Sequence, residues 1–101
     1  MKKKIDGFPV FDFGVPCEVE YYNSNNSWGF GGSRGLKYVF NENLYCKIGR
    51  AGTRHMGEFP HVSVWHITES KSYPRVFDET DSLKNRNKAK ELIHSLLKET
   101  K

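Results

Sequence analysis

An alternating pattern on both sides of a short polar turn constrains the fold of this chain more than any other feature. Apolar residues occupy every second position along 36–40 and again along 44–48, and the polar residues 41–43 separate the two runs. A period of two predicts β-strands, because successive side chains of a strand point to opposite faces of a sheet. Two such runs joined by a short polar segment predict a hairpin. The side chains expected to point inward are those of Leu36, Tyr38, Phe40, Leu44, Cys46 and Ile48.

Three further segments have the composition of strands. Residues 8–13 predict a short edge strand, because Pro9 has no N–H to donate to a neighbouring strand. Residues 17–22 alternate between apolar and polar side chains, and the polar residues 23–27 then turn the chain. Residues 61–67 are apolar on both faces, which predicts a strand in the interior of the sheet.

The last twenty residues predict a helix. Asp81 or Ser82 can cap its N-terminus. Apolar residues then recur at helical spacing and form a stripe that must pack against the sheet. The stripe consists of Ala89, Leu92, Ile93, Leu96 and Leu97, and the opposite surface carries Lys84, Arg86, Lys88 and Lys90. We therefore expect an α+β fold: a small antiparallel sheet that could close into a barrel, packed by one C-terminal amphipathic helix.

The composition fits one globular domain with a positive charge. The chain has 101 residues, of which 37% are hydrophobic and 28% charged, and its net charge is +4. We expect a single domain over residues 1–101, with a flexible basic tail at 1–5. The positive excess lies beyond residue 30 and suits a polyanionic partner. No apolar run is long enough to span a membrane, and Asp6, Gly7 and Pro9 interrupt the start where a secretory signal would need one.

The two cysteines predict thiols rather than a disulfide or a metal site. Cys17 and Cys46 both lie in strand patterns, which favours buried thiols in a reducing cytoplasm. Neither cysteine has another Cys or a His close to it in sequence. His61 and His66 are five residues apart on one expected strand, so their side chains point to opposite faces and cannot share a metal there. We expect no metal and no cofactor.

A loop rich in glycine and aromatic residues is the first candidate site. It joins two expected strands over residues 27–37. Exposed aromatic rings stack on nucleic-acid bases, and neighbouring cations neutralise phosphates. Trp28, Phe30, Arg34, Lys37 and Tyr38 could supply that chemistry. The alternative is that Trp28 and Phe30 fold back as a plug over the sheet.

A second candidate site spans residues 49–55. Two glycines, Arg50, Arg54 and His55 could bind a phosphate through backbone N–H groups and guanidinium groups. The segment lacks the spacing of a nucleotide-binding loop, and a solvated hairpin tip is the alternative. His55 lies among cations, which would favour a neutral imidazole that accepts protons.

Residues 19–40 resemble the front of a cold-shock domain. The segments Val19–Asn23, Trp28–Gly31 and Tyr38–Phe40 follow in the same order as in that family. The resemblance implies a small barrel that binds single strands through aromatic side chains. The chain departs from the family at Glu20, where a Lys is expected.

Residues 18–59 are also similar to the catalytic half of the small guanyl-type microbial ribonucleases. Glu20 (or Glu18) stands where that family has its catalytic base, and His55 precedes Phe59 by four residues, as its catalytic His precedes a Phe. The resemblance implies that the carboxylate takes the proton of the 2′-hydroxyl and that the imidazole protonates the leaving oxygen. Arg34 and Lys37 would then hold the phosphate.

These features together predict a small basic cytoplasmic protein that binds nucleic acid, with single strands or RNA preferred. Two alternatives stay open: a metal-independent small ribonuclease of toxin type, with Glu20 and His55 as its candidate catalytic pair, and a small regulator that binds a protein partner. Small basic single-domain chains of this kind are common among accessory proteins of phages and mobile elements.

Overall fold

The computed structural model describes residues 4–5, 7–25, 32–53, 57–69 and 74–99. The main element is a five-stranded antiparallel sheet whose strands neighbour one another in chain order. These strands are β3 (Glu18–Asn25), β4 (Gly32–Asn41), β5 (Leu44–Thr53), β6 (Gly57–His66) and β7 (Arg75–Thr80). A two-stranded sheet precedes it, formed by β1 (Lys4–Ile5) and β2 (Phe8–Pro9), and the helix α1 (Leu83–Glu99) follows it. The predicted α+β class is confirmed.

The hairpin expected from the alternating pattern is present as β4 and β5. Leu36 pairs with Ile48 and Tyr38 pairs with Cys46, so the predicted inward side chains share one face. Both strands run to ten residues and are longer than the pattern indicated. The backbone N–H of Asn43 donates to Oδ1 of Asn41 at 2.8 Å, which closes the turn.

Other strands differ from the sequence-based expectation. The strand expected at 8–13 is reduced to Phe8–Pro9, which pairs with Lys4–Ile5 of the expected tail. The following residues pack without strand pairing, and Phe13 is buried in the core. The strand expected at 61–67 lies between β5 and β7, so its interior place in the sheet is confirmed. β7 was not predicted as a strand.

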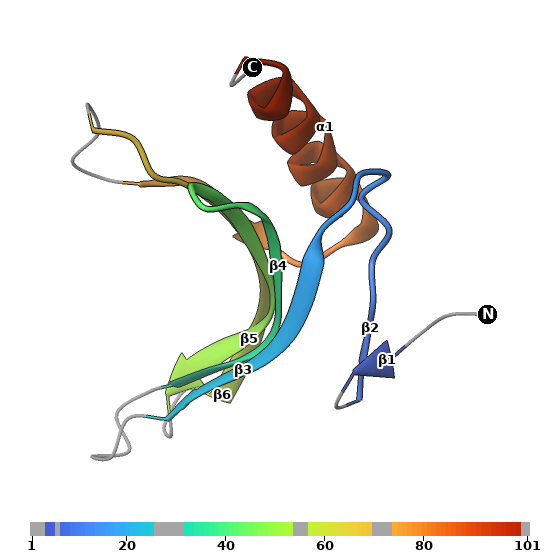
Figure 1. The fold of residues 1–101 in the computed structure, drawn as a ribbon. Coiled ribbons are helices and arrows are strands. Elements are labelled where there is room, and N and C mark those ends of the chain that lie inside the picture. Colours follow the sequence, from blue (N-terminus) through green and yellow to red (C-terminus); the bar gives the residue numbers. More distant parts are fainter. Residues whose placement is uncertain (1–3, 6, 26–31, 54–56, 70–73, 100–101) are drawn as a thin grey trace.

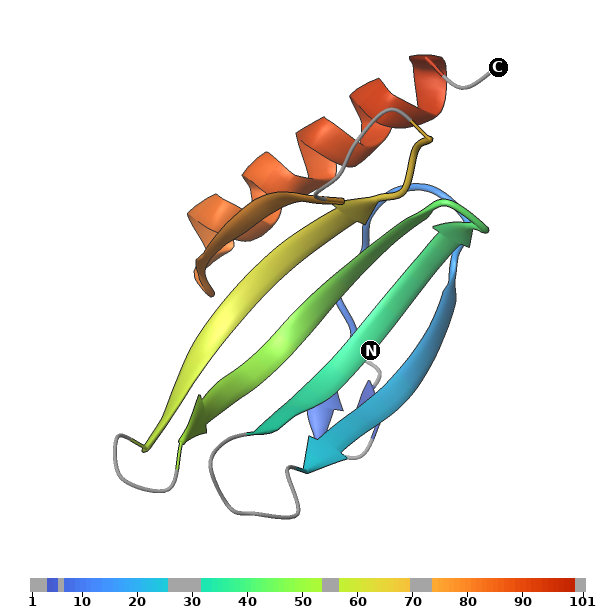
Figure 2. The same ribbon diagram turned by 90° about the vertical axis from the view of Figure 1, so that its left-hand side faces the viewer.

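The sheet has one covered and one uncovered face. The helix and the N-terminal segment lie on the same side of the sheet, and the strands curve so that the concave face points away from both (Figure 1). Figure 2 views this concave face directly, with all five strands in front of the helix. The sheet does not close into a barrel. We call this uncovered concave surface the open face.

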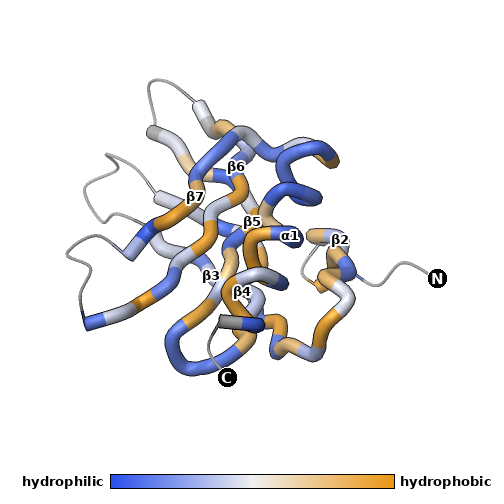
Figure 3. The backbone as a smooth tube through the Cα atoms, turned by 90° about the horizontal axis from the view of Figure 1, so that it is seen from above, coloured by the Kyte–Doolittle hydropathy of each residue, from blue (hydrophilic) through white to orange (hydrophobic). Residues whose placement is uncertain are grey.

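The core lies between the covered face and the elements packed on it. Figure 3 shows hydrophobic and hydrophilic residues alternating along the strands. Phe13 of the N-terminal segment contacts the rings of Tyr38 and Phe40 edge to face, at centroid distances of 4.9 and 5.2 Å. Ala89 and Ile93 of the helix are fully buried, which confirms the predicted apolar stripe. The buried hydrophobic residues are Phe13, Leu36, Tyr38, Leu44, Cys46, Ile48, Val62, Val64, Ala89, Ile93 and Leu96.

Two paired glycines lie where neighbouring strands approach closely. Gly35 of β4 is directly opposite Gly49 of β5. A Cβ on Gly35 would lie 2.5 Å from the Cα of Gly49, and a Cβ on Gly49 would meet the carbonyl oxygen of Arg34. Only glycine fits this approach, which is a common use of glycine in strongly curved strands.

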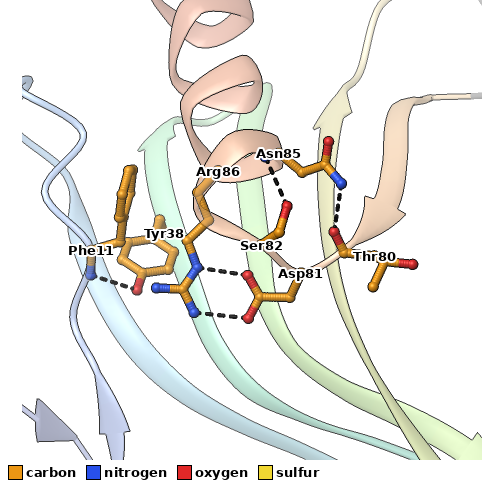
Figure 4. A network of polar contacts seen from close by, with 7 residues as sticks. All are labelled: Phe11, Tyr38, Thr80, Asp81, Ser82, Asn85 and Arg86. Carbon is orange, nitrogen blue, oxygen red and sulfur yellow. Dashed lines mark hydrogen bonds and ion pairs between the residues drawn. The ribbon is translucent and has the colours of Figure 1, made fainter.

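The start of α1 is held by polar contacts (Figure 4). Oγ of Ser82 accepts the backbone N–H of Asn85 at 3.1 Å, so Ser82 is the N-cap. Asp81 binds Arg86 through two hydrogen bonds of 2.6 and 2.8 Å. Arg86 is therefore partly buried in an ion pair instead of covering a solvated surface. Among the residues that the structure describes, α1 is the one helix, and it is not long and apolar enough to cross a membrane.

Candidate functional site

The open face gathers aromatic and cationic side chains on neighbouring strands. Strand pleating and register place alternate residues of each strand on this face. The central residues of this surface, which we call the aromatic–cation cluster, are Tyr22, Lys37, Tyr45, Lys47, Trp65 and Arg75.

Two aromatic rings form the middle of the cluster. Tyr45 and Trp65 are register partners on β5 and β6, and their rings stack with centroids 5.8 Å apart and an interplanar angle of 9°. A cation flanks each ring: Nζ of Lys37 lies 4.5 Å from the centroid of Tyr45, and Cζ of Arg75 lies 5.6 Å from that of Trp65. Nε1 of Trp65 donates to Oγ of the buried Ser63 at 3.2 Å, which fixes the orientation of the indole.

Lys47 has three aromatic rings around it. Its Nζ lies 5.0 Å from the ring centroid of Tyr22, 5.8 Å from that of Tyr45 and 5.7 Å from that of Trp65. Burial lowers the pKa of Lys47, and the charge of Lys37 lowers it further. The two lysines are register partners on β4 and β5. Like charges directly opposite each other destabilise a sheet. An anion bound to both lysines would reduce their repulsion.

The acidic side chains of the open face lie on its edge strands. Glu18 and Glu20 belong to β3, and Asp78 belongs to β7, where it pairs with Arg75 at 3.3 Å. Among the described residues, neither Lys37 nor Lys47 has a carboxylate within ion-pair distance. The unpaired positive charge of the open face therefore lies on two interior strands, β4 and β5.

Two polar groups of the open face are buried without a hydrogen-bond partner. They are the hydroxyl of Tyr22 and Nε2 of His61. The two residues belong to one row across the sheet, separated by Gly35 and Gly49. Burial raises the pKa of Tyr22 to about 12, so the phenol stays protonated near neutral pH. Burial also lowers the pKa of His61, which keeps its imidazole neutral there.

The structure separates the residues that the sequence grouped as one binding site. Lys37 lies on the open face, and Glu20 is its register partner on β3. Arg34 and Arg50 face the opposite way, toward the N-terminal segment and the start of α1. Trp28, Phe30, Arg54 and His55, four of the sequence candidates, lie outside the described residues.

Tyr38 lies in the core and cannot contact a ligand at the surface. Its side chain is fully buried, and its hydroxyl accepts the backbone N–H of Phe11 at 3.0 Å (Figure 4). It alternates with Lys37, so the pleat that exposes the lysine on the open face turns the tyrosine inward. Tyr38 is therefore not part of the candidate surface.

Sequence reasoning did not select Tyr22, Tyr45, Lys47, Trp65 or Arg75. The pattern that predicted inward residues in the hairpin also assigns Lys37, Tyr45 and Lys47 to the outer face. That signal was available in the sequence. Arg75 had no comparable signal, because β7 was not predicted as a strand.

No protein-family model matches the chain, and comparisons with curated proteins and with solved structures found no significant match.

The fold bears on the two family resemblances. The barrel implied by the cold-shock resemblance is absent, because β3 and β7 remain the two edges of an open sheet. The ribonuclease resemblance rests on Glu20 and His55, of which the described residues include only Glu20. In that family the main helix precedes the sheet, whereas α1 follows it here.

Proposed function

We propose that the protein binds single-stranded nucleic acid, with RNA preferred, on the open face. The observation that carries the proposal is the position of Lys47 among three aromatic rings, directly opposite Lys37, at the centre of an uncovered concave sheet. Phosphates would bind to this lysine pair and relieve its repulsion. Bases would contact the exposed parts of the Tyr45 and Trp65 rings.

The arrangement favours a flexible strand as the ligand. Lys37 and Arg75 lie over the outer sides of the stacked rings. A base reaches such a ring only if the cation moves onto a phosphate of the same ligand, and a strand with unpaired bases can make both contacts together. Paired bases of a duplex offer no such face, since they are stacked on one another.

The test is binding of a short labelled RNA of mixed sequence, followed by fluorescence anisotropy at low salt. We expect binding by the wild type and loss of affinity in Lys47→Gln, whose side chain keeps a similar size without the charge. Arg50→Gln is the matched control, because Arg50 lies on the opposite side of the sheet. Absence of RNA binding at low salt would reject the proposal and favour a protein partner for the open face.

A metal-independent ribonuclease is the second candidate, and the position of Glu20 favours it. Its carboxylate lies on the open face opposite Lys37, beside the proposed phosphate site. A carboxylate at this place could take the proton of a 2′-hydroxyl. Chelator-treated protein would then cleave RNA to a cyclic phosphate, and Glu20→Gln would stop it. Intact RNA after prolonged incubation would leave binding alone as the function, with the cytoplasm as its proposed location.

A further inference from the structure

The two edge strands of the five-stranded sheet, β3 and β7, differ in their protection against pairing with another chain. An edge strand has unpaired backbone N–H and C=O groups, and proteins usually shield them with a short strand, a bulge, a proline or a lysine. β7 has two of these features. It is six residues long, and Val76 is skipped in its register with β6, as in a β-bulge.

β3 has none of these features. It is eight residues long, it contains neither proline nor lysine, and its register with β4 runs without a shift. Figure 2 shows β3 as the outermost strand, and Figure 1 shows the N-terminal segment on the covered face rather than in the plane of the sheet. Among the described residues, the backbone of β3 pairs with β4 and hydrogen-bonds to no other segment. Its outer side is therefore open to a further strand.

The charges of β3 restrict the strand that can pair with it. Glu18 and Glu20 lie in its first half, and its second half, from Tyr22 to Asn25, is uncharged. Among the described residues, neither carboxylate has a cation within ion-pair distance. Carboxylates directly opposite these two would repel them, whereas neutral or basic side chains would not. A partner strand must therefore place an uncharged or basic part opposite the first half of β3.

A second copy of β3 meets this requirement when the two strands run antiparallel about a two-fold axis. Directly opposite residues must belong to the same face of the sheet, so one residue of β3 must lie opposite its own copy. An axis at Tyr21 or at Tyr22 uses nearly the whole strand and sets the acidic half of each copy opposite the uncharged half of the other. An axis at Glu20 would set this carboxylate opposite its own copy, and their repulsion disfavours it.

We propose that two copies of the protein form a dimer by pairing their β3 strands, so that the two sheets join into one continuous sheet. The backbone groups on the outer side of β3 supply the hydrogen bonds, as in other cases of strand addition. The same pairing sets the two open faces side by side, and the Lys37–Lys47 pair of each copy then belongs to one surface. The partner is a second copy rather than another protein because β3 is complementary to itself. The inference does not depend on nucleic-acid binding at the open face.

The first experiment measures the mass of the full chain by sedimentation equilibrium over a range of concentrations. We expect a reversible dimer. Ser24 is the position to vary, because it is exposed and lies opposite Glu18 or Glu20 in the two favoured registers. Ser24→Glu should weaken the dimer, and Ser24→Lys should strengthen it. The dissociation constant should change by about 2-fold to 30-fold, since each cross-strand charge pair occurs twice in a two-fold dimer.

The net charge of the chain predicts the opposite order of the two variants, which makes the test specific. Each copy has a net charge of +4, so Ser24→Glu lowers the general repulsion between copies and Ser24→Lys raises it. The matched controls are Ser95→Glu and Ser95→Lys, at an exposed position of α1, which packs mainly on β6 and β7. They should produce only this weak general effect. A dimer in which the Ser24 and Ser95 variants behave alike would overturn the inference. A chain that stays monomeric at all concentrations would overturn it too and leave the edge to a strand of another protein.

Hydrogen exchange locates the contact between the copies. In concentrated protein, the outer amides of β3 should exchange more slowly than in dilute protein. The amides of β7, the other edge strand, should exchange at the same rate in both. Ser24→Glu should reduce the protection of β3, because it weakens the dimer. Exchange in β3 that does not depend on concentration, or protection that appears in β7 instead, would overturn the inference.

Discussion

Tyr45 and Trp65 lie directly opposite each other on β5 and β6, and their rings are stacked within 9° of parallel. Such a cross-strand pair stabilises a sheet by about 0.2–1 kcal/mol. Its position on the uncovered face places it where the proposed nucleic-acid ligand would bind. The hydrogen bond from Trp65 to Ser63 fixes the indole, so the pair is already ordered before a ligand binds.

Replacing Trp65 tests the contact between bases and the ring pair. Trp65→Ala should lower the affinity for single-stranded RNA by about 1–3 kcal/mol, the usual contribution of one stacked base, and Trp65→Phe should retain part of it. Fluorescence anisotropy with labelled RNA measures the change. Tyr21→Ala is the control, because Tyr21 is an exposed aromatic residue that faces Phe8 on the other side of the sheet. Equal losses in the two alanine variants would contradict the assignment.

His61 should make the protein less stable at acidic pH. Burial holds its pKa below the usual value of 6.5, and the positive charges of Lys47 and Arg75 add to this, although Asp78 and Asp81 oppose it. Between the lowered pKa and 6.5 the unfolded chain binds more protons than the folded one, so stability falls as the pH falls through this window. At pH values below both the folded and the unfolded pKa of His61, the loss in the free energy of unfolding is complete and no longer changes with pH.

Two measurements check this expectation. An NMR titration of the His61 ring should give a midpoint below 6.5. The melting temperature of His61→Gln should depend less on pH across the same window than that of the wild type. A midpoint at or above 6.5 would show that the ring is solvated or paired with an acid.

Gly49→Ala should destabilise the sheet. The added Cβ would meet the carbonyl oxygen of Arg34 and the Cα of Gly35, both of them backbone atoms that cannot rotate away. We expect a loss of about 1–3 kcal/mol, as for other overpacked sites. Urea unfolding measures it, and an unchanged midpoint would mean that the strands are less closely spaced than described.

The alternation of residues was sufficient to predict the β4–β5 hairpin and the apolar stripe of α1. Both are local signals: a period of two in a strand and a recurrence every three or four residues in a helix. The same alternation assigns Tyr45 and Lys47 to the outer positions of the hairpin, but alternation by itself does not mark outer residues as a binding surface. Trp28 and Phe30 of the glycine-rich loop are outside the described residues.

The remaining features depend on contacts between distant segments. Arg34 and Lys37 are three residues apart, and the pleat of β4 places them on opposite faces. Arg86 approaches Arg50 only because the helix returns across the sheet. The sequence of β7 has no clear alternation of apolar and polar residues, and the strand is stabilised by pairing with β6. The position of Arg75 beside Trp65 therefore could not be predicted from the sequence.

Tyr38→Phe should separate a role in the core from a role in binding. The substitution removes the hydroxyl that accepts the N–H of Phe11 and leaves the ring in place. A part-buried donor would lose its partner, so we expect a stability loss of about 1–3 kcal/mol in chemical denaturation. RNA affinity should stay at the wild-type value. Weaker RNA binding at unchanged stability would contradict the placement of Tyr38 in the core.

The salt dependence of RNA binding tests the central claim most directly. For single strands the logarithm of the association constant falls with the logarithm of salt concentration by about 0.7 for each phosphate contact. With RNA that lacks a terminal phosphate, the double variant Lys37→Gln/Lys47→Gln should therefore reduce the slope by about 1.4. The double variant Arg34→Gln/Arg50→Gln should keep the wild-type slope, provided that both proteins retain the wild-type melting temperature. A slope that is unchanged in the lysine variant but reduced in the arginine variant would contradict nucleic-acid binding on the open face.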